Sequence, residues 1–536
     1  MEEFDFIVIG AGPSGCVVAS RLTEDPTVSA VLLEAGPGQR SGILATNSAL
    51  ATIVYGPKKS AYNWGFETEV DPGLNNRKDY HVLGRGLGGG TQINTLMYMR
   101  GHALDYERWA AMGNPGWGWN DVLPYFKKSE DNQTFDDEYH GKGGPVWVEE
   151  LRTDNPYHEI LRKACNEAGW PYNPDLNGKT QEGFRPTQVM MKNGERHHAG
   201  QAFILPHLDK RSNLKLHCDT HVARILFEGK RAVGVEVVCK GERRQIRARK
   251  EVIVSAGGIL SAQLLKLSGV GDGAELQKHG IAQVHQLPAV GKHLHDHIDV
   301  VLGHHIPGDP NLMGISPTAV SAFFKGMKRW KKERRGMFTT NYAEVTGFMS
   351  LTPESPKPEI QYEFVVVLAM DHGRDMYWKH GMSTHILLLD PKSRGTVTLA
   401  SNKWEDFPLV DFKYFSHPDD LQVMVEGTRR VATVYDTPTM KSLVKRDLIT
   451  ENCKTQAEWE QFCRNGGGTN YHPVGSCRMG ADPLDNVVDH RLKVHGLEGI
   501  RVIDSSIFPA IMGGNTTAPT YMVGEKGADM IKADWK

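Results

Sequence analysis

Residues 4–15 read FDFIVIGAGPSG, a short apolar run that ends in closely spaced glycines. The run predicts a parallel strand buried on both faces. The helical spacing of the next apolar residues predicts a helix over 13–25, and VSAVLLEAG at 28–36 predicts a second strand. Together these segments predict a strand, helix and strand unit, the building block of a parallel sheet.

The glycines of this stretch have the GxGxxG spacing of a dinucleotide-binding turn, at Gly10, Gly12 and Gly15. Glycines allow a tight turn and a close approach of backbone to a pyrophosphate. The start of the helix, which includes Ser14, offers free N–H groups and a positive dipole end to the phosphates. Glu34 ends the second strand and can accept hydrogen bonds from ribose hydroxyls. The unit therefore predicts dinucleotide binding, without a choice between NAD and FAD.

Length, charge and cysteine content exclude several classes of protein. The chain has 536 residues, 40% of them hydrophobic and 24% charged, which predicts a large core divided between two joined domains. A net charge of -2 gives no field that would gather nucleic acid, so we expect no nucleic-acid partner. Seven scattered cysteines without CxxC spacing favour a reducing compartment over a disulfide framework or structural zinc.

The beginning of the chain and its apolar runs bear on localisation. The sequence passes from Met1 directly into the first strand, which leaves no room for a secretory signal. No apolar run approaches the ~20 residues that a membrane-spanning helix needs. We therefore expect a cytoplasmic protein, with any membrane contact peripheral and on the inner face.

Two further groups of segments complete the predicted architecture. EVIVSAGG at 251–258 predicts a strand that leads into a helix over 259–271, and IRVIDSS at 500–506 repeats the strand signature. PEIQYEFVVV at 358–367 alternates like a strand, and HILLLDPKSRGTVTLAS at 385–401 alternates like strands joined by a turn. The second group suits an antiparallel sheet inserted between parts of the first.

The glycine-rich stretch GRGLGGGTQIN at 84–94 closely resembles the first signature of the glucose-methanol-choline (GMC) oxidoreductases. The resemblance continues in family order through blocks at 255–271, 287–297, 471–480 and 495–520. It therefore spans essentially the whole chain, and the pattern is most similar to bacterial alcohol, sorbose and choline-type dehydrogenases. It implies FAD as the cofactor and oxidation of an alcohol as the activity.

The resemblance also implies a domain organisation. The fold class is α/β, with a Rossmann-like FAD-binding domain and an inserted α+β substrate domain built on an antiparallel sheet. We expect the FAD-binding domain to comprise 1–155, 201–300 and 465–536. The substrate domain would comprise 156–200 and 301–464.

Several residues outside the first turn are implied as cofactor-binding residues. The glycines of 84–94 let backbone pass close to a flat cofactor, and Asn94 can bond to its polar edge. By resemblance, Val222 would contact the adenine through its main chain and Asp504 would lie near the phosphate and ribityl groups. Ile93 stands where some family members place a flavin-linked histidine, so we expect non-covalent FAD. The implied set is completed by Arg85, Gly89, Gly90 and Thr516.

The resemblance implies a catalytic pair, His472 and Asn515. Oxidation of an alcohol requires a base beside the carbinol oxygen while the hydride departs from carbon. His472, in YHPVGSCRMG, is the candidate base, because a neutral imidazole can take a proton near neutral pH. Asn515, in GGNTTAPT, could donate a hydrogen bond to the alkoxide through its amide.

Three histidines in the 287–297 block, His293, His295 and His297, superficially suggest a metal site. The resemblance implies no metal there. In addition, histidines serve many structural purposes in proteins. We therefore expect no metal ion in this protein.

The substrate and the electron acceptor are less well specified. Substrate-facing positions are expected around 341–344 and 361–364. Tyr362 and Glu363 would suit a quaternary ammonium, whereas the valines at 365–367 would suit an apolar alcohol. The acceptor could be oxygen, a quinone or another carrier. The alternative functions are an FAD-containing lyase of the same fold (a hydroxynitrile lyase or a fatty acid photodecarboxylase) and a non-enzymatic flavin redox sensor.

A predicted helix at 320–335 bears on the acceptor. Val320, Phe323, Phe324 and Met327 lie on one face of it, surrounded by five basic residues, Lys325, Lys328, Arg329, Lys331 and Lys332. The helix could dock on anionic lipid, which would make a quinone the acceptor. It could equally be a lid that packs its apolar face over the active site.

Overall fold

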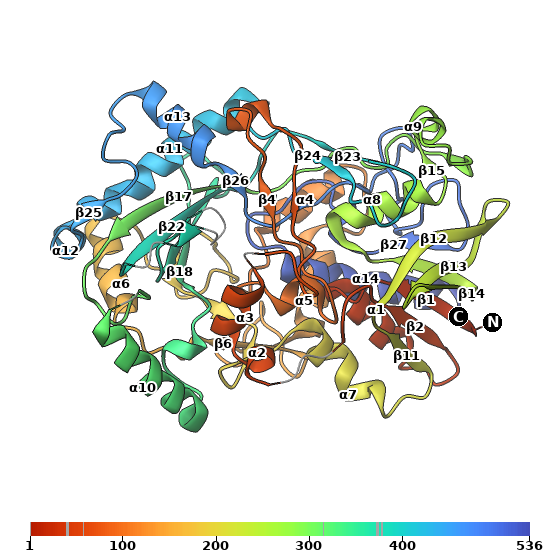
Figure 1. Ribbon diagram of the computed structural model, residues 1–536, viewed down its shortest axis with the longest axis horizontal. Helices are drawn as coiled ribbons and strands as arrows, with labels where there is room; N and C mark the ends of the chain where they lie inside the picture. The colour runs from red at the N-terminus through yellow and green to blue at the C-terminus, as the bar shows by residue number, and fades with distance from the viewer. Residues whose placement is uncertain (1, 39–41, 57, 315, 371–374, 377–378) are drawn as a thin grey trace.

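Two regions, each centred on a sheet, lie side by side in the molecule (Figure 1). The structure is a computed structural model that describes residues 2–38, 42–56, 58–314, 316–370, 375–376 and 379–536. The region that contains both chain termini is on the right of Figure 1, and the region surrounded by α6, α10, α11 and α13 is on the left.

The first sheet has seven strands, and its core is parallel. The order is β11 (Leu214–His217), β2 (Ala30–Leu33), β1 (Glu2–Ile9), β14 (Glu242–Val254), β13 (Arg231–Cys239) and β12 (Thr220–Glu228), with β27 (Ile500–Val502) beside β14. The pairs β11–β2, β2–β1, β1–β14 and β14–β27 are parallel, while β12, β13 and β14 form an antiparallel meander. The strands predicted at the N-terminus, at 251–258 and at 500–506 are thus confirmed.

Helices connect and cover this sheet. After β1 the chain turns into α1 (Pro13–Leu22), and α8 (Gly257–Leu267) follows β14. The C-terminal α14 (Thr517–Asp534) packs against α1. The contact is close, because a Cβ at Gly524 would lie 2.9 Å from Val17 Cβ. The other main helices are α3 (Ser48–Tyr55), α4 (Ala103–Ala111), α5 (Trp119–Ser129), α6 (Tyr157–Glu167), α10 (Pro317–Glu333), α11 (Pro418–Ala432) and α13 (Gln456–Gly466).

The second sheet also has seven strands, and all of its pairs are antiparallel. Its order is β25 (Arg446–Asp447), β17 (Ile298–His305), β22 (Gly381–Leu388), β19 (Ile360–Val365), β18 (Ala343–Met349) and β7 (Gly183–Pro186), with β26 (Gly468–Thr469) beside β17. The predicted fold class is confirmed. The division of the chain at 155, 200, 300 and 464 stays a prediction.

One prediction about this sheet is wrong. The segment 385–401 does not form two paired strands, because β22 belongs to the second sheet and β23 (Thr396–Thr398) pairs with β24 (Leu409–Asp411). The Asp420 carboxylate accepts hydrogen bonds from the backbone N–H groups of Lys392 and Ser393. These bonds hold the connection against the start of α11, and the chain leaves the sheet there.

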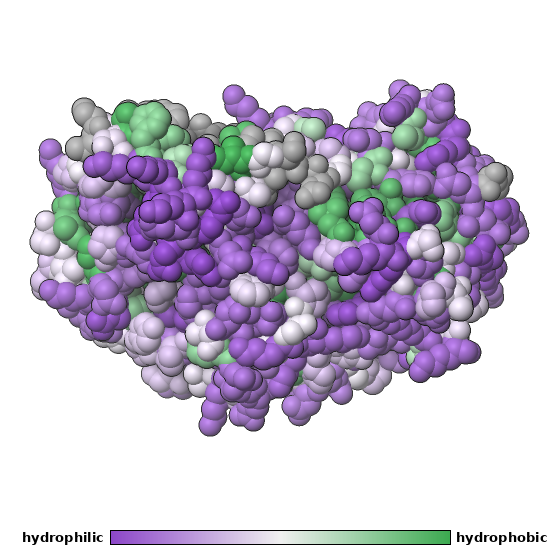
Figure 2. Space-filling view, turned by 90° about the horizontal axis from the view of Figure 1, so that it is seen from below, coloured by the Kyte–Doolittle hydropathy of each residue, from purple (hydrophilic) through white to green (hydrophobic). Residues whose placement is uncertain are grey.

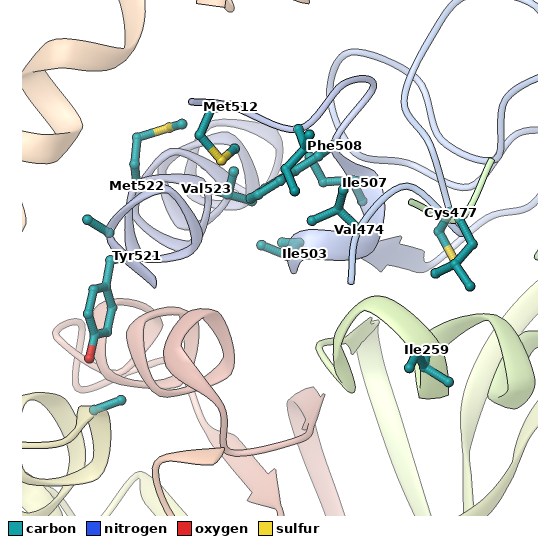
Figure 3. Packing of buried hydrophobic residues seen from close by; sticks show 14 of the residues in the cluster. Ile259, Val474, Cys477, Ile503, Ile507, Phe508, Met512, Tyr521, Met522 and Val523 are labelled. Atoms are coloured by element: carbon teal, nitrogen blue, oxygen red, sulfur yellow. The ribbon is translucent and has the colours of Figure 1, made fainter. Parts of the chain in front are cut away.

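A continuous apolar core supports the C-terminal segments that carry the predicted catalytic pair. Figure 3 shows side chains of this core, with Met512 near Met522 and Val523 of α14 and Val474 near Ile503 and Ile507. Val474 lies two residues after His472, and Met512 lies three residues before Asn515; both are fully buried. Packing therefore fixes the backbone next to His472 and Asn515.

Candidate functional site

A cavity of about 1430 Å³ runs between the two sheets. One end is lined by the Gly10 turn, Glu34 and Val222, and the other by His472, Asn515 and residues of the second sheet. The cavity therefore brings both ends of the predicted site into one continuous space.

The three glycines of the turn after β1 have different surroundings. Gly10 has a φ of 99°, in the left-handed region that disfavours side chains. A Cβ at Gly15 would lie 1.9 Å from the carbonyl oxygen of Gly10, so Gly15 permits contact between helix and turn and does not itself line the cavity. A Cβ at Gly12 would meet nothing within 4 Å. Gly12 and the buried Ser14 both line the cavity at the N-terminus of α1.

Glu34 lines the cavity and is also bonded to the surrounding backbone. Its Oε2 accepts a hydrogen bond from Ala11 N at 2.9 Å, and its Oε1 accepts from Gly36 N and Gly86 N at 2.8 and 2.9 Å. The carboxylate thus joins the first glycine turn to the second glycine-rich stretch. Its predicted bond to a ribose stays a prediction.

The second glycine-rich stretch approaches the first turn closely. A Cβ at Gly89 would lie 2.8 Å from Gly12 Cα, whereas one at Gly90 would meet nothing within 4 Å. Among the predicted cofactor residues, Gly89, Gly90, Asn94, Val222, Asp504 and Thr516 line the cavity, as does Ile93. Arg85 does not: its guanidinium lies over the Trp64 ring at 4.6 Å and donates to Ala35 O.

This end of the cavity fits FAD. The start of α1 presents N–H groups, and Gly12 and Gly90 leave room for a ligand. Asp504 is held beside α8, where its Oδ2 accepts from Gly257 N and Ser261 Oγ at 2.8 and 2.6 Å. Ser261 thus helps to hold the Asp504 carboxylate at the start of α8.

At the other end, hydrogen bonds determine which nitrogen of His472 carries the proton. His297 Nε2 lies 3.0 Å from the carbonyl oxygen of Met512, which can only accept, so this nitrogen is protonated. Burial lowers the pKa of His297 to about 4, which makes the ring neutral and leaves Nδ1 as an acceptor. His297 Nδ1 lies 2.9 Å from His472 Nδ1, so His472 donates from Nδ1.

His472 therefore keeps an unshared electron pair on Nε2. This nitrogen lies 3.4 Å from Asn515 Nδ2, and both residues line the cavity. Burial, with a smaller contribution from His297, holds the pKa of His472 well below its ordinary value. The imidazole is thus neutral near neutral pH, in the tautomer that can accept a proton from a group in the cavity.

Asn515 is oriented by the second sheet. Gln361 Nε2 on β19 donates to Asn515 Oδ1 at 3.1 Å and to Glu363 Oε1 at 2.9 Å. Because Asn515 Oδ1 is engaged, its Nδ2 is directed toward His472 Nε2 and Glu363 Oε1. Asn515 precedes α14, whose N-cap is Thr516, so Asn515 is not itself the helix cap.

Asp296 fixes the backbone of the candidate base. Its Oδ1 accepts a hydrogen bond from His472 N at 2.8 Å, and its Oδ2 accepts from the Thr469 hydroxyl and from Tyr414 OH. Burial raises the pKa of Asp296 to about 7. The sequence did not predict these orienting contacts of Asp296, His297 and Gln361, although the first two residues lie in the 287–297 block and Gln361 lies in the expected range 361–364.

Only some of the predicted substrate positions line the cavity. Tyr342, Ala343 and Glu363 line the cavity, as do Val365 and Val367. Asn341, Glu344, Gln361, Tyr362 and Phe364 do not. Tyr362 points to the other face of the sheet, where its ring lies 4.9 Å from that of Trp170. The pairing of Tyr362 with Glu363 around a quaternary ammonium is therefore wrong.

The three histidines of the 287–297 block have separate partners. His293 Nε2 lies 2.7 Å from Asp485 Oδ1, and His295 Nε2 accepts from Ile511 N at 3.0 Å. His297 contacts His472. Hydrogen bonds between distant segments thus account for the histidines that superficially suggest a metal site.

The predicted helix at 320–335 is present as α10. Phe323 contacts the ring of Phe338 at 5.0 Å, and Trp330 is buried. Val320 and Phe324 are exposed. None of the residues that the structure describes in α10 lines the cavity. Within the described ranges, no helix combines the length and the apolar character needed to cross a membrane.

Sequence comparisons identify a family and relatives. A family model described as GMC oxidoreductase matches in two parts, residues 4–299 and 391–524. The chain is 39% identical to an alcohol dehydrogenase (acceptor) of Pseudomonas putida, over 98% of this chain and 95% of the relative. It is 38% identical to oxygen-dependent choline dehydrogenase 1 of Chromohalobacter salexigens, over 99% of this chain and 95% of the relative.

Solved structures give the same fold. A variant of formate oxidase from Aspergillus oryzae RIB40 superposes with a TM-score of 0.91 and 26% identity, over 99% of this chain and 98% of that one. Pyridoxine 4-oxidase from Mesorbium loti superposes with a TM-score of 0.87 and 25% identity, over 98% of each chain. Both likenesses extend over the two sheets and the cavity between them.

Proposed function

The chain belongs to the GMC oxidoreductase family, and from that premise we propose that it oxidises a primary aliphatic or polyol-like alcohol, giving the aldehyde (a secondary alcohol would give the ketone). As a member of this family it is an FAD-dependent oxidoreductase that acts on CH–OH donors. We assign His472 as the general base. The observation that carries this assignment is the unshared pair on His472 Nε2, which is directed at Asn515 beside the cavity.

Several residues would act on the carbinol group, each with a separate role. His472 Nε2 takes the hydroxyl proton, and the Asn515 amide donates a hydrogen bond to the oxygen as negative charge develops. His297 keeps His472 in the required tautomer, and Gln361 keeps the Asn515 amide facing the oxygen. Bound FAD would supply the acceptor for the hydride that leaves the carbinol carbon. The Gly10 turn, Glu34, Gly90 and Asp504 would hold it.

An anaerobic panel of alcohols tests this function. Flavin absorbance is followed after each alcohol is mixed with the holoenzyme in the absence of oxygen. We expect bleaching by at least one primary alcohol, because oxidation must reduce the flavin. A lyase, a photodecarboxylase or a redox sensor would show no bleaching by any alcohol in the dark.

We propose that the FAD is held without a covalent bond. Ile93 lines the cavity, and its hydrocarbon side chain cannot form a bond to the flavin. Acid precipitation should then release the yellow colour into the supernatant. Colour that remains in the washed pellet would contradict this proposal.

The electron acceptor is proposed to be oxygen, a quinone or another carrier. The names of the relatives support this range, since one is an alcohol dehydrogenase (acceptor) and another an oxygen-dependent choline dehydrogenase. Reoxidation of the substrate-reduced enzyme by oxygen, by a soluble quinone and by an artificial dye distinguishes the three. The fastest reoxidant in this comparison identifies the class of acceptor.

We further propose that α10 makes a peripheral contact with an anionic membrane surface. Phe324 and Val320 are 68% and 55% exposed, so α10 presents two large apolar side chains to solvent. Lys325, Lys328 and Lys331 are exposed, and no ion pair is recorded for them within the described chain. Figure 2 shows apolar side chains beside a hydrophilic area on the underside of the molecule, the side on which α10 lies in Figure 1. This combination suits anionic lipid.

Sedimentation with anionic liposomes at low salt tests the contact. We expect the wild type to co-sediment and Phe324→Ser to bind less. Leu484→Ser is the matched control, because Leu484 is 71% exposed outside α10. Failure of the wild type to co-sediment, or an equal loss in the control, would contradict membrane docking.

A further inference from the structure

Three neighbouring strands of the second sheet place polar groups on the wall beside the catalytic pair. Glu363 on β19 is paired across the sheet with His385 on β22, and Asp299 lies on the next strand, β17. All three line the cavity, together with His472 and Asn515. The function proposed above gives a role to none of the three.

Two atoms of this wall remain available to a ligand. Glu363 Oε1 is engaged by Gln361 and Asn515, but within the described chain no hydrogen bond is recorded for Glu363 Oε2. His385 Nδ1 is engaged by Asp299, and His385 Nε2 likewise has no recorded partner among the described residues. Glu363 Oε2 and His385 Nε2 are not enclosed in the protein interior, so both are accessible from the cavity.

Asp299 determines the hydrogen-bonding character of His385. Its Oδ2 lies 2.5 Å from His385 Nδ1 and also accepts from Asn470 Nδ2 at 3.2 Å. Burial alone would lower the pKa of His385, but the Asp299 carboxylate outweighs it and raises this pKa above its ordinary value. The imidazolium form is therefore favoured, in which His385 Nε2 carries a proton that it can donate.

The two free atoms are complementary to one chemical group. A hydroxyl can accept from His385 Nε2 and at the same time share a hydrogen bond with Glu363 Oε2, as donor to the carboxylate or as acceptor from the neutral acid. A quaternary ammonium has no N–H, O–H or lone pair with which to make either bond. The wall therefore favours an uncharged hydroxyl over a choline-like cation.

The position of the wall relates this hydroxyl to the reacting carbon. Glu363 Oε1 lies 3.5 Å from Asn515 Nδ2, which lies 3.4 Å from His472 Nε2. A carbinol oxygen between His472 and Asn515 would thus have its neighbouring carbon close to Glu363. Beyond this point the lining becomes apolar, with Val365 and Val367.

We propose that Glu363 and His385 form a subsite for a second hydroxyl group of the substrate, on the carbon adjacent to the carbinol, so that this enzyme prefers 1,2-diols with an apolar tail. The proposal rests on the alcohol oxidation proposed above and names its substrate class. No covalent step is added, because the second hydroxyl is bound and is not oxidised.

The test compares 1,2-hexanediol with 2-methyl-1-hexanol, in which a methyl group replaces the second hydroxyl. We expect kcat/KM for the diol to exceed that for the mono-alcohol by about 10- to 100-fold, because a site built to bond a hydroxyl discriminates against its absence. Glu363→Leu should bring the ratio close to one. Glu363→Gln, which keeps hydrogen-bonding atoms at the same place, should retain part of the preference.

Controls separate the subsite from general damage. Val367→Ala alters the apolar part of the cavity and should leave the ratio of the two substrates as in the wild type. FAD content and the thermal midpoint show whether each variant is folded. The variant His472→Ala cannot turn over efficiently, so binding of the diol can be measured in it by calorimetry. Adding Glu363→Leu to this variant should raise the dissociation constant of the diol.

The possible failures are distinguishable. Equal oxidation of both alcohols by the wild type, or an unchanged ratio in Glu363→Leu, would overturn the subsite and leave the alcohol oxidation intact. If neither these alcohols nor any in the wider panel reduces the flavin, the proposed function is overturned and the subsite with it.

Discussion

The two ends of the cavity are built from different kinds of contact. At the Gly10 end the lining consists largely of backbone, with Glu34 bonded to three main-chain N–H groups and open space in front of Gly12. At the His472 end the orienting bonds involve side chains, which come from separate parts of the chain. Substitutions at the Gly10 end should therefore lower the retention of FAD. Substitutions at the His472 end should slow alcohol oxidation while FAD stays bound.

The first prediction concerns the backbone end of the cavity. Gly12→Val should leave the fold intact, since a Cβ at Gly12 meets no protein atom within 4 Å, but the side chain would occupy space that FAD needs. We expect FAD content to fall by about tenfold or more, a loss of at least ~1.4 kcal/mol in binding. The measurement is the ratio of flavin to protein absorbance after purification.

Gly12→Ala provides a graded comparison for this prediction, because its smaller side chain should reduce FAD content less. Circular dichroism of both variants reports on the fold. Full FAD content in Gly12→Val would show that the cofactor does not approach this turn, and the contrast between the two ends would then be lost.

A second prediction concerns the hydrogen bond that sets the tautomer of His472. His297→Phe removes the acceptor for His472 Nδ1–H, so the imidazole would populate the tautomer whose Nε2 carries a proton. We expect flavin reduction by a good alcohol to slow by about 10- to 100-fold, within the usual contribution of a positioned general base. FAD content should be unchanged. Stopped-flow absorbance under anaerobic conditions measures the rate.

His297→Asn tests whether this effect comes from the hydrogen bond. An asparagine can offer an acceptor oxygen to His472, so it should recover part of the rate lost in His297→Phe. Identical rates in the two variants, together with normal FAD content, would assign His297 a packing role only.

A third prediction concerns stability at the side-chain end of the cavity. Burial raises the pKa of Glu363 from an ordinary value of 4.5 to about 7 in the folded protein. A raised folded pKa stabilises the protein at low pH, and this contribution is lost as pH rises through about 7. Glu363→Gln removes the titrating group. The free energy of unfolding of the variant, relative to that of the wild type, should therefore be up to about 3 kcal/mol higher at pH 8 than at pH 5.

Thermal denaturation at the two pH values measures this difference. The quantity of interest is the change in midpoint between Glu363→Gln and wild type at pH 8, compared with the same change at pH 5. The glutamine keeps the size and the hydrogen-bonding atoms of the side chain, which limits other effects. A difference that does not vary with pH would show that Glu363 is not buried as a neutral acid.

Local patterns explain what could be predicted from the sequence. The glycine turn was predictable because its requirements fall within six consecutive residues, from Gly10 to Gly15. The strands of the first sheet were predictable because continuous apolar runs mark them. His472 and Asn515 were identified by resemblance, and the structure places the two side chains 3.4 Å apart.

The remaining parts of the site depend on packing between distant segments. His297 lies 175 residues before His472, and Gln361 lies 154 residues before Asn515. No spacing rule relates such positions, and from sequence alone His297 suggests a metal ligand. The partner of β23 was wrongly predicted for a similar reason, because bonds from Asp420 redirect the chain after β22.

We propose that His472 is the base for alcohol oxidation, and this role can be tested directly. The most direct measurement is anaerobic stopped-flow flavin reduction by a good alcohol in wild type and His472→Ala, across several pH values. We expect the variant to keep its FAD and to be slower by ~10² to 10⁴. Because the pKa of His472 is held well below its ordinary value, loss of its unprotonated form should not limit the wild type near neutral pH. A His472→Ala enzyme that has full FAD content and reduces its flavin at nearly the wild-type rate would contradict the assignment.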